Sequence, residues 1–200
     1  MDDRLVESSH PEWHLGTRQA YGMAPLAVLV SCLGLYGFGR MSRLLGFSSF
    51  SVRVTPDQAP AAVAAAVGIL FAVAALTVGL VLLHEWVHAV AYRMAGAAPR
   101  YGAKMVGWFF PVVYVTAPGR WLTRRQYAAV LLAPTIAVNV VGLSLMAAMG
   151  SWSWMLVFPL ASHLGGCVGD WWIAAVLARL PAGARIEDTP QGFRFRAPRP

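Results

Sequence analysis

Positions 61–92 read AAVAAAVGILFAVAALTVGLVLLHEWVHAVAY and hold a single charged side chain, Glu85. A helix needs about 20 mostly apolar residues to cross a bilayer, so this stretch is long enough to span one. Inside hydrocarbon the backbone must satisfy its own hydrogen bonds, and a helix does so within one segment. The stretch therefore predicts a transmembrane helix and, with it, an all-α membrane protein.

Three further apolar runs, at 23–39, 128–149 and 153–178, predict three more spans. The whole chain is 58% hydrophobic and only 12% charged. That is about half the charged fraction that a soluble domain needs to cover its surface, which excludes most cytosolic enzymes. Within the four runs the only charged side chains are Glu85 and Asp170. Charged residues at such positions usually mark function.

The basic residues flank the apolar runs and predict the orientation of the chain in the cell membrane. With four spans, the N-terminal tail, the 93–127 loop and the C-terminal tail lie on one side and carry 13 of the 16 basic residues. Basic residues concentrate on the cytoplasmic side, so both termini are predicted to be cytoplasmic. The basic residues are not interleaved with exposed aromatic residues, so no nucleic-acid partner is expected.

The chain outside the spans has two segments with β-like patterns. Residues 108–117 (WFFPVVYVTA) are too short to cross and rich in β-formers, so an extended or re-entrant segment near the cytoplasmic face is expected. The C-terminal tail, 181–200, alternates around Thr189-Pro190-Gln191-Gly192 and predicts a small hairpin. The predicted organisation is a tail over 1–22, one membrane domain over 23–180 and the C-terminal tail.

Local signals mark some helix ends. Thr123 and Gln126 fit a capping box at the start of the third span. The small residues Gly165, Gly166 and Gly169 would let the last span approach another helix closely.

The late part of the second span carries the motif HExxH, as His84-Glu85-Trp86-Val87-His88. On a helix, positions i and i+4 face the same way, so both imidazoles can bind one Zn²⁺. Glu85 lies beside them, where it can take a proton from a zinc-bound water as general base. Composition alone predicts roughly 0.002 such matches in a chain of this length. The motif therefore predicts a zinc hydrolase.

A third zinc ligand is needed, and Asp170 and His163 compete for the place. They are seven residues apart, about 10.5 Å along a helix axis, so they cannot readily bind the same ion. We prefer Asp170, because a buried carboxylate needs a cation more than a neutral imidazole does. His163 is left as an oxyanion donor or a core histidine. Two roles stay open for Asn139. Its side chain either bonds the backbone carbonyl that lacks a helical donor because of Pro134, or it holds a substrate peptide.

These residues resemble a family of small multi-span zincin peptidases related to the site-2 proteases. The resemblance rests on HEWVH at 84–88, the aromatic β-like stretch, Leu132-Ala133-Pro134 and Gly169-Asp170. It implies that His84, His88 and Asp170 bind zinc, with Glu85 as the base. It also implies that residues 108–117 hold substrate as a strand. The Leu-Asp-Gly signature of the site-2 proteases and a PDZ-like domain are both missing.

The expected function is hydrolysis of peptide bonds by a membrane-embedded zinc metalloprotease, a zinc-dependent endopeptidase with Zn²⁺ as its cofactor. A peptide inserted in or near the membrane is the expected substrate, because a soluble one would not meet a buried site. One alternative is a non-catalytic scaffold or pseudo-protease in which a metal braces the helices. A third class, an ion- or proton-coupled transporter, would use Glu85 and Asp170 as a cation site. The sequence leaves the oligomeric state open.

Overall fold

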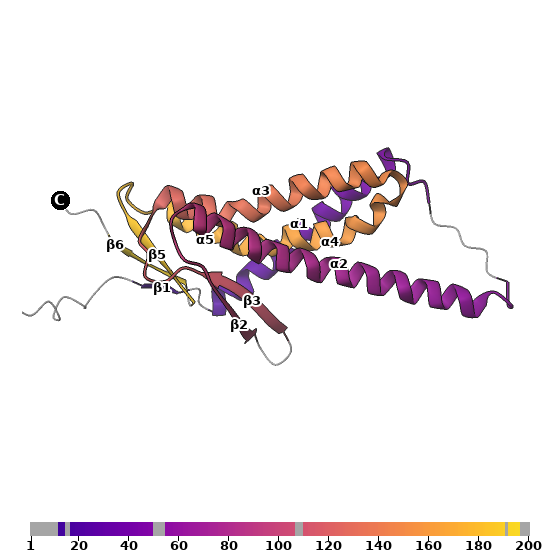
Figure 1. Ribbon diagram of the computed structural model, residues 1–200, viewed down its shortest axis with the longest axis horizontal. Helices are drawn as coiled ribbons and strands as arrows, with labels where there is room; N and C mark the ends of the chain where they lie inside the picture. Colours follow the sequence, from indigo (N-terminus) through magenta and orange to yellow (C-terminus); the bar gives the residue numbers. More distant parts are fainter. Residues whose placement is uncertain (1–11, 15–16, 50–54, 107–109, 191, 197–200) are drawn as a thin grey trace, which may run out of the picture. The chain divides into compact units, whose positions relative to one another are not determined.

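The computed structural model describes residues 12–14, 17–49, 55–106, 110–190 and 192–196, which form helices and short strands (Figure 1). The elements are β1 (Glu12–His14), α1 (Thr17–Leu44), α2 (Ala59–Met94), β2 (Arg100–Val106), β3 (Phe110–Thr116), β4 (Leu122–Thr123), α3 (Arg124–Met149), the 3₁₀ turn η2 (Gly150–Ser153), α4 (Trp154–Gly166), α5 (Val168–Ala178), β5 (Arg185–Thr189) and β6 (Gly192–Arg196). The chain divides into two compact units. The first contains Met1–Tyr21, Glu85–Ala133 and Asp170–Pro200, and the second contains Gly22–His84 and Pro134–Gly169.

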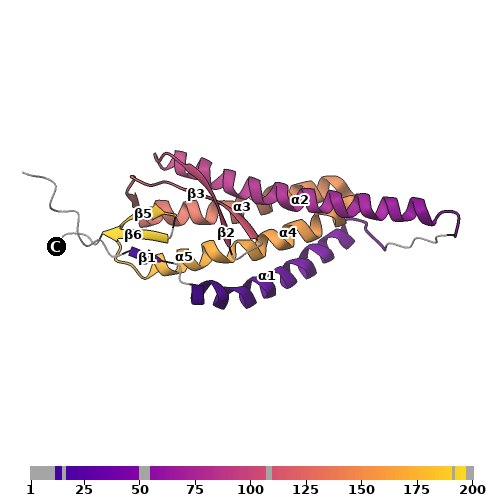
Figure 2. The ribbon, with the colours of Figure 1, turned by 90° about the horizontal axis from the view of Figure 1, so that it is seen from below.

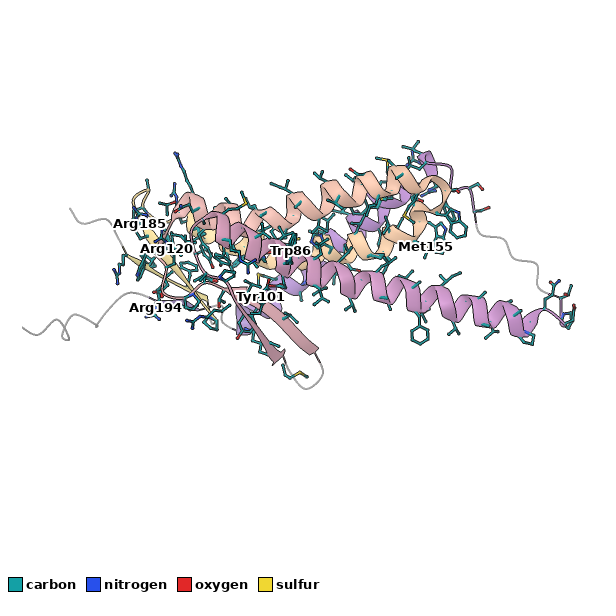
Figure 3. The ribbon with its side chains drawn as sticks, viewed as in Figure 1. Trp86, Tyr101, Arg120, Met155, Arg185 and Arg194 are labelled. Carbon is teal, nitrogen blue, oxygen red and sulfur yellow. The ribbon has the colours of Figure 1, made fainter. Side chains whose placement is uncertain are left out.

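The first unit contains a four-stranded antiparallel sheet in the order β1-β6-β5-β4. Strands β5 and β6 form the hairpin predicted for the C-terminal tail, with Ile186 opposite Phe195. An apolar core packs at this sheet and includes Leu122, Ile186 and Phe193, each at most 1% exposed. The arginines Arg120, Arg185 and Arg194 lie around this sheet (Figure 3).

A second hairpin in this unit pairs β2 with β3. It contains most of the segment predicted to be extended, although residues 107–109, and with them Trp108 and Phe109, lie outside the described residues. Tyr114 lies over Gly102, where any larger side chain would collide with the ring. The ammonium group of Lys104 also lies 5.5 Å from the centre of the Tyr114 ring.

In the second unit α1 packs closely against α4, and both views of the ribbon show them side by side (Figure 2). A Cβ at Gly34 would come within 3.0 Å of the Ala161 backbone, and one at Gly165 would collide with Ser31. The hydroxyls of Ser42 and Ser153 share a buried hydrogen bond of 2.9 Å. Gly165 therefore has the close-packing role that the sequence predicts.

Three helical segments among the described residues are long and apolar enough to cross a membrane: Gly22–Leu44, Ala59–Met94 and Arg124–Ala178. Large apolar side chains on α2, such as Leu70 at 68% and Phe71 at 71% exposure, are left uncovered by protein, which fits contact with lipid. The protein is therefore described as a mostly helical membrane protein with small β-hairpins.

The prediction of four separate spans is not supported. The predicted fourth span, 153–178, is divided into α4, with 13 residues, and α5, with 11. The division falls at Cys167, where the backbone amide bonds back to the carbonyls of His163 and Leu164 in mixed α and 3₁₀ geometry. Neither piece alone reaches the length of about 20 residues that a span needs.

Candidate metal centre

The HExxH residues lie near the end of α2, as the sequence predicts. His84 and His88 are one turn apart on this continuous helix, so their imidazoles project from the same side of it. Glu85 begins the part of the helix that belongs to the first unit. The capping box that starts the next membrane helix is confirmed as well, since Thr123 and Gln126 exchange side-chain-to-backbone hydrogen bonds of 2.9 and 3.1 Å.

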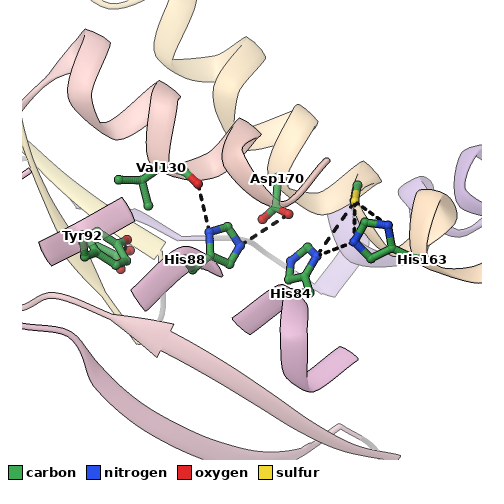
Figure 4. Close-up of polar contacts among 8 residues, drawn as sticks. His84, His88, Tyr92, Val130, His163 and Asp170 are labelled. Carbon is green, nitrogen blue, oxygen red and sulfur yellow. Dashed lines mark hydrogen bonds and ion pairs between the residues drawn. The ribbon is translucent and has the colours of Figure 1, made fainter. Parts of the chain in front are cut away.

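In the first unit the structure brings His88 and Asp170 together. His88 Nε2 lies 3.6 Å from Asp170 Oδ2, and both side chains are largely buried, at 8% and 17% exposure (Figure 4). These two residues come from α2 and from the first turn of α5. The break at Cys167 places Asp170 near the start of a new helix rather than in the middle of a long one.

The other ring nitrogen of His88 is held by the backbone. His88 Nδ1 donates to the carbonyl oxygen of Val130 at 3.0 Å, when the ring carries its proton there. That carbonyl is available because Pro134, four residues later in α3, has no N–H to bond it. The proline thus gives His88 a fixed acceptor and leaves the Nε2 lone pair directed at Asp170. Metal-binding histidines are commonly oriented in this way.

The His88–Asp170 pair fits a metal ion. Their 3.6 Å separation is longer than a hydrogen bond and close to the roughly 3.4 Å that separates two ligand atoms on a tetrahedral Zn²⁺. An imidazole nitrogen and a carboxylate oxygen are also ligands that zinc uses. The chemistry and spacing of this pair therefore suit the predicted cofactor.

The pair opens onto a cavity of about 200 Å³ that lies wholly within the first unit. Glu85, His88 and Asp170 line it together with Lys104 and Thr116. Glu85, His88 and Asp170 thus share one cavity with the β2–β3 hairpin.

The floor of the cavity contains a buried carboxylate that sequence reasoning missed. Tyr92 and Tyr127 donate to the two oxygens of Asp188 at 2.6 and 2.7 Å. Burial raises the pKa of Asp188 from its ordinary value of 3.8 to about 6, although both tyrosine hydrogen bonds act to lower it. One sequence signal was available, since Tyr92 follows His88 by four residues and so continues the same helix face. Asp188 itself lies in the C-terminal tail, where no sequence pattern indicated a buried carboxylate.

In the second unit His84, which is half-buried, contacts His163. His84 Nδ1 and His163 Nε2 are 3.1 Å apart, and Cys167 Sγ lies 3.7 Å from His163 Nε2 (Figure 4). His163 is therefore a neighbour of a HExxH histidine. Neither role that the sequence left open for it, as third ligand or as oxyanion donor, is tested by this contact.

Asn139 is not among the residues that line the cavity. Its Nδ2 donates to the carbonyl of Thr135 at 2.7 Å, within its own helix. The carbonyl that Pro134 frees belongs to Val130, and His88 binds it instead. The suggestion that Asn139 bonds the freed carbonyl is therefore wrong, because that carbonyl lies nine residues before it.

Comparison with known proteins places the chain in a family. A family model described as "Putative zincin peptidase" matches residues 77–185, which is more than half of the chain. The protein belongs to this zincin-like peptidase family. The match begins just before HEWVH and ends at the first residue of β5. No curated protein and no solved structure matches the chain.

Proposed function

We propose that the protein is a membrane-embedded zinc metalloprotease that hydrolyses peptide bonds of membrane-inserted or membrane-proximal substrates. The observation that carries the proposal is the His88–Asp170 pair beside Glu85 on the wall of one cavity. Family membership supports a metallopeptidase, and the three apolar helical segments support a membrane setting. A closer relationship to the site-2 proteases is part of this proposal.

The proposed zinc ligands are His84, His88 and Asp170. The helical spacing of the two histidines supports the first pair, and the 3.6 Å separation supports the second. A Zn²⁺ ion held by three protein groups would lower the pKa of a water molecule and polarise a peptide carbonyl.

The residues of the chain would then handle the proton. Glu85 lines the cavity next to the pair, so its carboxylate can take a proton from the attacking water and pass it to the leaving amine. The Val130 carbonyl keeps the proton of His88 on Nδ1, so Nε2 stays available. Lys104 and Thr116 present a cation and a hydroxyl that can hold a substrate backbone.

The proposed orientation puts both termini and the cavity on the cytoplasmic side. One sheet joins strands from the N-terminal region, the 93–127 loop and the C-terminal region, which supports placing these three segments on the same side of a membrane. The same segments carry most of the basic residues, which favours the cytoplasm.

The test compares zinc content and peptide hydrolysis in purified protein. Wild type should bind one zinc per chain and cleave a labelled transmembrane peptide in detergent micelles. Glu85→Gln should keep the zinc and lower the turnover by at least about 100-fold, because it removes the general base. His88→Ala and Asp170→Ala should lose both zinc and turnover.

Two controls make the result decisive. Glu187→Gln changes a glutamate of the sheet that accepts the Gly119 N–H, outside the lining of the cavity, and should keep zinc and turnover. If wild type holds only the trace zinc of His88→Ala, the proposal fails. A zinc-loaded wild type that is no more active than Glu85→Gln would instead indicate a scaffold.

A further inference from the structure

A second group of metal-binding atoms lies in the second unit, formed by His84, His163 and Cys167. His84 Nδ1 and His163 Nε2 are 3.1 Å apart, and Cys167 Sγ lies 3.9 and 3.7 Å from them. The point equidistant from these three atoms is about 2.1 Å from each, close to the bond lengths that imidazole and thiolate form with a metal. Cys167 Sγ also lies 3.9 Å from His163 Nδ1, so the sulfur faces the side of this ring, and the two side chains would have to turn for the thiolate and the Nε2 lone pair to meet one ion.

The backbone holds these side chains in place. His163 and Cys167 are four residues apart, and the Cys167 N–H bonds to the His163 carbonyl at 3.0 Å, so one helical turn sets their spacing. The rings of His84 and His163 meet edge to face with their centroids 5.2 Å apart. Cys167 is fully buried, and His163 is 6% exposed. The backbone spacing is therefore already set, and binding would need these side chains to turn within it.

We propose that this cluster is a Cu(I) site. Two imidazoles and a thiolate in a trigonal arrangement are a ligand set that proteins use for copper, and thiolate selects soft ions. Charge favours the monovalent ion, because Cu⁺ with one thiolate is neutral. Zn²⁺ with the same ligands would leave a net positive charge buried among apolar helices. Cu⁺ also accepts three ligands, whereas structural zinc takes four.

Binding of one Cu⁺ ion releases one proton from the protein. The Cys167 thiol loses its proton to solvent and forms the sulfur–copper bond. The two imidazoles stay neutral, so the proton of His84 resides on Nε2 when its Nδ1 lone pair binds copper, and no electron is transferred. Copper would therefore withdraw the Nε2 lone pair that the proposed zinc site needs. The copper site does not depend on peptide hydrolysis.

Titration with Cu(I) tests the site. The purified full-length chain, freed of metal, is titrated anaerobically with Cu(I) in competition with a coloured Cu(I) chelator. We expect one tightly bound copper per chain, with an affinity at least 100-fold lower in Cys167→Ser and in His163→Ala. Cys32→Ser is the matched control, because Cys32 is the exposed free thiol of the same unit, and it should keep the wild-type affinity. Asp170→Ala should also keep it.

Copper-edge X-ray absorption of the wild-type complex gives a readout that needs no variant. We expect one sulfur and two nitrogen neighbours. A spectrum without a sulfur neighbour would overturn the proposal, and so would equal copper affinity in wild type and Cys167→Ser. Loss of copper in Asp170→Ala would place the ion with the zinc ligands and overturn it too. Failure of peptide hydrolysis leaves all these results unchanged, so the two proposals fail separately.

Discussion

At the scale of single residues, the clearest feature is how the ring of His88 is fixed. Its Nδ1 has a backbone acceptor only because Pro134 leaves the Val130 carbonyl without its helical donor. A residue that looks like a helix defect thus orients a candidate metal ligand. The effect on the ion should be indirect but measurable, because outer partners of metal ligands typically contribute 10- to 100-fold in affinity.

Replacing Pro134 tests this arrangement. Pro134→Ala restores an N–H that competes with His88 for the Val130 carbonyl, so zinc affinity should fall about 10-fold, as measured by chelator competition. Pro159→Ala is the matched control, because Pro159 is an equally buried proline inside α4 and is not among the residues that line the cavity. Equal zinc affinity in wild type and Pro134→Ala would show that the proline does not act through His88.

The Asp188 carboxylate predicts a pH dependence of stability. Its pKa is about 6 in the folded protein and about 3.8 when unfolded, so between these values only the folded chain holds the proton. The free energy of unfolding should therefore fall as pH rises from about 4 to 6, by about 3 kcal/mol in total from this group. In Asp188→Asn this contribution should disappear, which thermal melting in detergent at several pH values can measure.

The control for this experiment is Asp57→Asn. Asp57 lies in an exposed turn, where a hydrogen bond from Thr55 lowers the pKa of its carboxyl below 3.8, so its titration lies mostly below this window and acts in the opposite direction to that of Asp188. Melting curves of Asp57→Asn should keep the slope of wild type. If Asp188→Asn also keeps that slope, the carboxyl of Asp188 is not the buried acid that its surroundings indicate.

At the scale of elements, packing of α1 against α4 depends on one of two adjacent glycines. A Cβ at Gly165 would meet the Ser31 hydroxyl and come 2.8 Å from the Ala27 carbonyl oxygen, whereas a Cβ at Gly166 has open space around it. Both glycines lie in the last turn of α4. Alanine substitutions at the two positions can therefore separate the effect of close packing from the effect of helix propensity.

Alanine at each position should have opposite effects. Gly165→Ala should destabilise the protein by about 1–3 kcal/mol through overpacking. Gly166→Ala should be neutral or stabilise it by up to about 1 kcal/mol, because alanine is the better helix former. Thermal melting of the two variants in the same detergent measures the difference. Similar melting temperatures would mean that α1 and α4 are not in close contact.

Prediction from sequence succeeded where the signal is local. The placement of residues 84–88 on one helix, the Thr123–Gln126 cap and the tail hairpin all rest on residues within a few positions of each other. The break at Cys167 was missed because apolar residues continue on both sides of it, and hydropathy cannot distinguish one long helix from two short ones. Asp188 was missed because its partners Tyr92 and Tyr127 are 96 and 61 residues away in the chain.

At the scale of the whole molecule, the four-stranded sheet constrains the topology in a membrane. Its strands come from three regions of the chain that are separated by apolar helical segments. A hydrogen-bonded sheet cannot have strands on both sides of a bilayer. Under the proposed topology, the chain between these regions leaves the sheet side and returns to it.

Cysteine labelling in cells tests this topology. Under the proposed cytoplasmic orientation, single cysteines at Arg120 and Arg194, which lie at the sheet, should react with a membrane-impermeant maleimide only in inverted vesicles. A cysteine at Asp57, in the turn before α2, should react in intact cells. Both native cysteines are replaced by serine in all three proteins. Labelling of the Arg120 and Arg194 positions from opposite sides would contradict the shared sheet.

The tail hairpin also has a consequence for biosynthesis. Asp188, Thr189, Pro190 and Gly192 form part of the cavity wall, yet the ribosome adds them after every helix has been made. A nascent chain inserted up to Ala178 already carries the proposed zinc ligands but lacks this wall. Under the proposed function, hydrolytic capacity would begin only when the last strands emerge and pair. The translocation machinery would thus be spared contact with a working protease during insertion.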